Sequence, residues 1–109
     1  MTEPNDIWRP QLIGTLQLYR TEDGGRKSSI SEGFRCPSFS QKEFRGQNGW
    51  TCFPLVGETP LAPGETRRLG FIFLMPELAI KEYLAAGIFY LWDGRLTGEA
   101  TDLRLPGVD

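Results

Sequence analysis

Apolar and polar residues alternate with a period of two over several short stretches, which is the pattern of strands with one buried face. The alternation is clearest in Leu12–Tyr19 and in Arg67–Met75. One face of the second stretch carries Leu69, Phe71 and Phe73, and the other carries Arg68, Ile72 and Leu74. Trp50–Leu55 is a shorter strand pattern and Ser28–Phe39 a weaker one.

The last part of the chain predicts a β-hairpin. Ile88–Trp92 is a run of β-branched, aromatic and aliphatic residues, and Leu96–Leu103 is the returning strand. We expect Asp93-Gly94 to form a two-residue turn between them, because glycine adopts positive φ without steric cost.

One segment, Pro76–Gly87, has the features of a helix, with proline at its start and glycine as a stop. Turn signals separate the predicted strands, and the chain contains 13 glycines and 8 prolines. The pattern therefore predicts an all-β fold, a small antiparallel barrel or sandwich with one short helical segment. Residues 1–10 are predicted to be a mobile lead-in, and residues 11–109 one barrel domain.

Composition narrows the classes of function. The formal charge is −2, which gives no global attraction to nucleic acid or to an anionic membrane. No apolar run approaches the ~20 residues of a transmembrane helix, and the first ten residues lack the apolar core of a secretory signal. We therefore expect a cytoplasmic protein in which Cys36 and Cys52 are free thiols, with a disulfide between them as the alternative.

The chain contains no histidine. This excludes Ser-His-Asp and Cys-His nucleophilic catalysis, histidine general bases and histidine-ligated metals. Glu65, Glu99 and Asp102 are carboxylates near predicted strand ends, but no spacing rule pairs them, so we interpret them as exposed turn charges. We expect no catalysis, no cofactor and no metal.

Three stretches, taken in order and with their spacing, resemble the C-terminal β-barrel domain of translation elongation factor Tu. They are DGGRKSSISEGFRCPSF, LAPGETRRLGFIFLMPELA and DGRLTGEA. The GGR turn of that family corresponds to Gly24-Gly25-Arg26, its GYRP strand to Gly33-Phe34-Arg35, and its final hairpin to Gly94–Gly98. The resemblance covers roughly residues 11–103 and implies a six-stranded antiparallel Greek-key barrel.

In that family the barrel binds the T-stem backbone of aminoacyl-tRNA and contacts the GTPase domain and the nucleotide exchange factor. The resemblance implies that a tRNA face here would consist of Arg26, Lys27, Arg35 and Gly98. Lys27 stands where the family has histidine, and Ser38 stands where it has glutamine. The chain has no GxxxxGK[ST] sequence, so we expect it to bind no GTP itself.

The charges near this predicted face give RNA binding modest support. Residues 20–45 contain six basic and four acidic residues, and this excess of two is small beside the ~6–10 phosphate contacts of a salt-sensitive binder. An alternative role for Arg26 is an ion pair with Glu22 or Asp23.

The late strands are apolar on both faces, although a barrel buries one face of each strand. Ile88, Tyr90 and Trp92 share one face, and Phe89 and Leu91 share the other. We predict an outer apolar surface, made of Ile72, Leu74, Phe89 and Leu91. The alternative is that Pro76–Gly87 and the region of Trp8 cover it. Our leading hypothesis is a stand-alone, non-catalytic protein-interaction module, with a protein partner or a second copy; the alternative is a tRNA-binding accessory to translation elongation.

Overall fold

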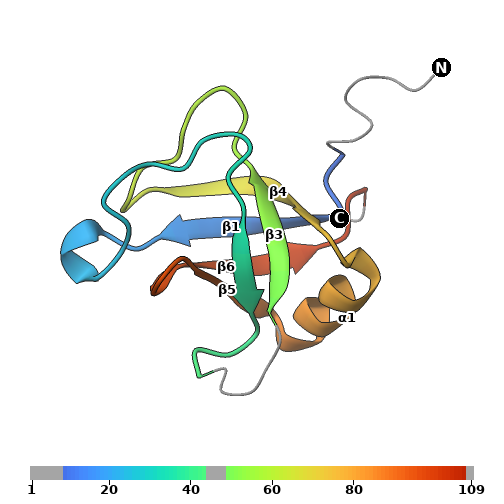
Figure 1. The fold of residues 1–109 in the computed structure, drawn as a ribbon. Coiled ribbons are helices and arrows are strands. Elements are labelled where there is room, and N and C mark those ends of the chain that lie inside the picture. Colours follow the sequence, from blue (N-terminus) through green and yellow to red (C-terminus); the bar gives the residue numbers. More distant parts are fainter. Residues whose placement is uncertain (1–8, 44–48, 108–109) are drawn as a thin grey trace.

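The computed structural model describes residues 9–43 and 49–107 (Figure 1). The strands of this part of the chain close into one antiparallel barrel in the order β1-β4-β3-β2-β5-β6. Their bounds are β1 Leu12–Leu18, β2 Cys36–Phe39, β3 Trp50–Leu55, β4 Thr66–Phe73, β5 Ile88–Trp92 and β6 Leu96–Arg104. The prediction of a small all-β barrel with one helix is confirmed.

The strand order is that of a Greek key. Strands β2, β3 and β4 follow one another as a meander, and β1 lies beside β4 rather than beside β2. β1 also pairs with β6, and this pairing closes the barrel. Of the predicted Ser28–Phe39 strand, only the last part is a strand, β2; Ile30 forms an isolated bridge with Leu61 instead.

The barrel interior is filled by the inward faces of the strands. Phe71, Phe73 and Phe89 form an aromatic cluster, in which Phe89 lies edge-to-face with Phe71 at 5.0 Å and with Phe73 at 5.7 Å between ring centres. The other fully buried apolar strand residues are Leu12, Leu16, Leu18, Cys52, Pro54, Leu91 and Ala100.

The predicted outer apolar surface is therefore wrong in two of its members. Phe89 and Leu91 are fully buried, so they belong to the core and not to the surface. In the register of the hairpin, Phe89 lies opposite Ala100 and Leu91 opposite Gly98, which are also buried. The outward face of β5 is the other one, with Ile88, Tyr90 and Trp92.

The helix α1 (Pro76–Ala86) lies against one end of the barrel (Figure 1). Pro76 occupies the first turn, where its missing N–H costs nothing, and Gly87 ends the helix in the left-handed conformation. Ala79 and Tyr83 of α1 are fully buried. We call this end of the barrel the helix end; it comprises α1 and the segments that follow β4 and β6.

The opposite end is covered by segments 24–35 and 56–65 and by the hairpin loop 93–95, and we call it the loop end (Figure 1). Ile30 and Leu61 close this end, with two backbone hydrogen bonds of 2.9 Å between them and both side chains buried. The hairpin loop differs from the prediction, because Trp92 pairs with Leu96 and leaves three loop residues rather than two.

A bulge in β6 shapes the helix end of that strand. Residues Ile13 and Thr15, two apart on β1, pair with Arg104 and Thr101, three apart on β6. Asp102 takes up the extra residue with φ 52°. As a result Leu103 packs against the core over Gly14, where a Cβ would lie only 2.7 Å from the Leu103 side chain.

Residues 1–8, including Trp8, lie outside the described residues, so the predicted contact of Trp8 and the predicted mobility of that segment are not addressed. The described Pro10 packs over Gly70 of β4, where a Cβ would overlap it. Among the residues that the structure describes, no helix is long and apolar enough to cross a membrane.

Candidate binding surfaces

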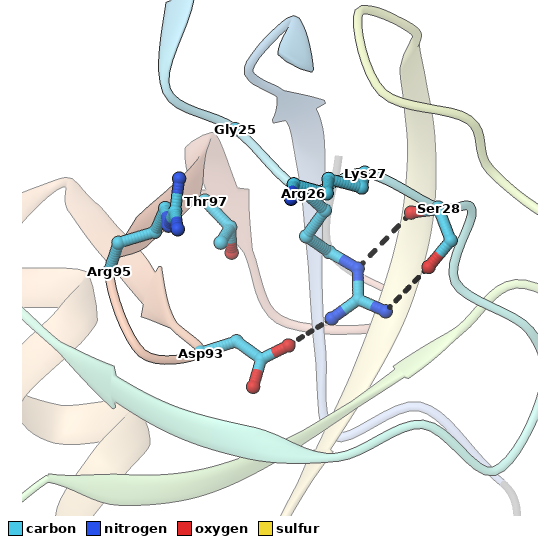
Figure 2. A pocket seen from close by; sticks show the side chains of 7 residues that line it. All are labelled: Gly25, Arg26, Lys27, Ser28, Asp93, Arg95 and Thr97. Atoms are coloured by element: carbon cyan, nitrogen blue, oxygen red, sulfur yellow. Dashed lines mark hydrogen bonds and ion pairs between the residues drawn. The ribbon is translucent and has the colours of Figure 1, made fainter.

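The loop end carries a polar hollow of about 360 Å³. Its lining comes from two distant parts of the chain, segment 25–28 and the hairpin loop with the start of β6 (Figure 2). The lining residues are Gly25, Arg26, Lys27, Ser28, Asp93, Arg95 and Thr97. Two of the predicted tRNA-binding residues, Arg26 and Lys27, therefore lie at one hollow.

Arg26 has partners on three sides. Its guanidinium forms an ion pair with Asp93 and donates to the backbone oxygen of Ser28 at 3.2 Å, as Figure 2 shows. It also lies 4.6 Å from the ring centre of Phe34, a cation–π distance. The side chain is only 16% exposed. Arg26 thus ties segment 25–28 to the hairpin, and little of its charge faces solvent.

The alternative pairing of Arg26 with Glu22 or Asp23 is wrong. Those carboxylates are near Arg20, whose Nε lies 2.9 Å from Asp23 and 3.9 Å from Glu22. The sequence could not show the pairing with Asp93, which lies 67 residues away.

Two further cations, Lys27 and Arg95, line the hollow, whereas the predicted residue Arg35 is not among its lining residues. Lys27, Arg35 and Arg95 are exposed, and none has a carboxylate partner among residues 9–43 and 49–107. Arg35 follows Phe34, on which Arg26 lies. Arg95 was missed from the sequence; the signal was its place in the hairpin loop, next to the residue that pairs with Arg26.

Gly98 was predicted to lie at the tRNA face, but the structure places it inside the barrel wall. It is buried, and a Cβ there would lie 2.8 Å from the backbone oxygen of Gln17. Its register partners are Leu18 on one side and Leu91 on the other. The structure therefore gives Gly98 a packing role between strands, because only glycine permits this close approach.

The helix end carries the exposed apolar surface. Among the described residues, five large apolar side chains are more than a third exposed: Leu74 62%, Met75 52%, Leu78 50%, Leu105 43% and Leu84 38%. All five follow β4, belong to α1 or follow β6. Leu74, Met75 and Leu78 line one hollow, and neighbouring exposed apolar residues of this kind usually mark an interaction site. We call Leu74, Met75, Leu78, Leu84 and Leu105 the apolar cluster.

A hollow of about 390 Å³ opens within this cluster, where β4 leads into α1. It is lined by Leu74, Met75, Pro76, Glu77 and Leu78. Of the predicted interface residues, Leu74 is thus in the exposed surface. Ile72 is half-buried on the outer wall of β4, opposite Phe53 of β3.

The two cysteines are register partners, Cys36 on β2 and Cys52 on β3, and both are free thiols in the core. Burial raises the pKa of the Cys36 thiol to about 12 and the pKa of the Cys52 thiol well above its ordinary value. Both are therefore protonated at neutral pH and poor nucleophiles.

The three carboxylates considered for catalysis each have a separate partner. Glu65 accepts a hydrogen bond from the backbone N–H of Ala62, and Glu99 accepts one from the Tyr19 hydroxyl at 2.8 Å. Asp102 pairs with Arg68 and Arg104. Within the described ranges, no three Cys, Asp or Glu residues gather into a group that could hold a metal ion.

The chain matches no model of a known protein family, and a search of curated proteins also found no match. The resemblance to the elongation factor Tu barrel therefore stays a prediction, and the surfaces themselves carry the functional interpretation.

Proposed function

We propose that this chain is a non-catalytic module that binds another protein through the helix end of its barrel. The observation that carries the proposal is the position of the apolar cluster. Its members come from three separate places in the sequence and gather at one end of the barrel. Each exposed apolar Å² costs on the order of 25 cal/mol in water, so burial against a partner would be favourable.

The helix is well suited to present such a surface. Tyr83 and Ala79 anchor α1 in the core, while Leu78 and Leu84 of the same helix face solvent. An interface on a fixed element loses less conformational entropy on binding than one on a loop. We place this activity in the cytoplasm, as the sequence predicts.

Capture from a native lysate tests the proposal. The tagged parent protein is compared with the double variant Leu74→Lys, Leu78→Lys and with a control, Lys27→Glu, Arg95→Glu, that alters only the loop end. We expect the parent and the control to retain the same protein partner and the helix-end variant to lose it. Equal retention by all three proteins would overturn the proposal.

A second candidate, RNA binding in translation as the resemblance implies, is favoured by one observation at the opposite end. Lys27 and Arg95 place two exposed cations at the hollow that holds the Arg26–Asp93 pair, and the exposed Arg35 follows Phe34, on which Arg26 lies. Phosphate oxygens are natural partners for such groups. A gel shift with tRNA tests this candidate: binding should weaken steeply with salt and should be lost when Lys27, Arg35 and Arg95 are changed to Ala. No shift at low salt would reject it.

A further inference from the structure

We propose that the partner at the helix end is a second copy of this chain, held in a two-fold symmetric dimer. This inference rests on the proposed function, since it names the occupant of the same surface. The hollow between β4 and α1 and a matching pair of residues in the same chain support it.

The residues that line the hollow indicate which group would bind in it. Leu74, Met75 and Leu78 offer apolar walls, and Glu77 is the charged residue in its lining. Glu77 has no cation within ion-pair distance among the described residues. The complementary group is thus a large apolar side chain next to a cation.

The chain itself carries such a pair at the end of β6. Leu105 is 43% exposed, and Arg104 directly precedes it. Among residues 9–43 and 49–107, Arg104 has one ion pair, with Asp102 at 3.5 Å, and both side chains are more than half exposed. Exposed ion pairs contribute little to stability, so Arg104 can exchange this partner at small cost.

The position of this pair permits a closed dimer. The end of β6 and the start of α1 both lie at the helix end (Figure 1). In a two-fold interface, residue i contacts residue j while j contacts i. Leu105 of each copy can therefore enter the hollow of the other, with Arg104 facing the partner's Glu77. Both Leu105 and Leu74 are exposed within one copy, so Leu105 does not fill the hollow of its own chain.

Net charge also permits self-association. The formal charge of the chain is −2, so two copies repel each other weakly. The exposed cations of the loop end lie at the far end of the barrel from this interface.

Sedimentation velocity of the purified full chain across a concentration series tests the proposal by charge reversal. Glu77→Arg and Arg104→Glu each place like charges opposite one another, and we expect each to weaken the dimer by about tenfold or more. The double variant restores opposite charges and should recover most of the affinity. Arg95→Glu makes the same change of charge at the loop end and should have no effect.

Leu105→Ser is a second test without a change of charge, and it should also weaken the dimer. Circular dichroism and melting temperature confirm that every variant is folded. A parent protein that stays monomeric throughout, or single variants that weaken the dimer without recovery in the double variant, would overturn the proposal. If a monomeric parent still captures a protein partner that Leu74→Lys, Leu78→Lys loses, this inference fails while the proposed function stands.

Discussion

The hydroxyl of Tyr83 lies 2.8 Å from the Oγ of Ser38, and this buried hydrogen bond joins α1 to strand β2. Ser38 Oγ donates to the backbone oxygen of Trp50 at 2.6 Å, so it accepts the proton of Tyr83. The Tyr83 ring stacks on Phe89 with ring centres 4.5 Å apart. Trp50 adds a second link to the helix through its Nε1, which donates to Glu82 at 3.0 Å. These contacts fix the surface that α1 presents.

Two substitutions of Tyr83 should distinguish the contribution of its hydrogen bond from that of its ring. Tyr83→Phe removes the hydrogen bond alone and should cost about 1 kcal/mol in the free energy of unfolding. Tyr83→Ala also removes the ring from the core and should cost about 3–5 kcal/mol. Urea denaturation measures both. Equal costs for the two variants would mean that the ring does not pack as described.

A lysine in β5 should destabilise the fold far more than a lysine at the helix end. Phe89→Lys forces an ammonium into the aromatic cluster and should cost several kcal/mol, on the order expected for an unpaired buried charge. Leu74→Lys adds the same charge at a residue that is 62% exposed, so it should lower the melting temperature far less, and only as far as it weakens the dimer. Thermal unfolding compares the two; a stable Phe89→Lys variant would contradict the assignment of Phe89 to the core.

Most of the fold could be predicted from the sequence, since period-two alternation and turn residues mark β1, β3, β4 and the final hairpin. The inward face of β5 could not, because all five residues of Ile88–Trp92 are apolar and alternation does not distinguish its faces. Pairing with β6 decides it. Pro76 and Gly87 mark the two ends of α1 in the sequence. Which side of the helix is exposed could not be predicted, because it depends on the packing of Ala79 and Tyr83 in the core.

The candidate sites were predicted less completely, for a similar reason. Arg26 and Lys27 were found through local motifs, whereas the partner of Arg26 comes from the hairpin loop. Leu105 and Met75 gave no local signal, because a single exposed apolar residue is ordinary in a sequence. Leu105 and Met75 become part of one candidate site only because the closed barrel brings chain segments about 30 residues apart to the same end.

The main role of Arg26 should be to stabilise the fold. Arg26→Ala removes the contact with Phe34 and the ion pair with Asp93, and should cost about 1–2 kcal/mol in the free energy of unfolding. Lys27→Ala, at the neighbouring exposed position, should cost less than about 0.5 kcal/mol. Chemical denaturation measures both variants. If Arg26→Ala were as stable as Lys27→Ala, Arg26 would not hold the hairpin loop in place.

The buried thiols predict a loss of stability in alkali. Burial raises the pKa of Cys36 from 9.0 in a free thiol to about 12, and Cys52 shifts in the same direction. Because the folded state holds these protons more tightly, the stabilisation is complete below about pH 9 and is lost as the pH rises toward 12. The double variant Cys36→Ala, Cys52→Ala should lose less stability over this interval than the parent. Melting temperatures from pH 8 to 11 measure the slopes, and identical slopes would contradict the prediction.

Site-specific photocrosslinking in living cells is the most direct test of an interface at the helix end. A photoreactive amino acid replaces Leu78 in one protein and Arg95, at the loop end, in another. The structure places the first side chain in the apolar cluster and the second beside the polar hollow. We predict a discrete protein adduct from position 78 and none from position 95. A protein or RNA adduct from position 95, with none from position 78, would contradict the proposal that this module works through its helix end.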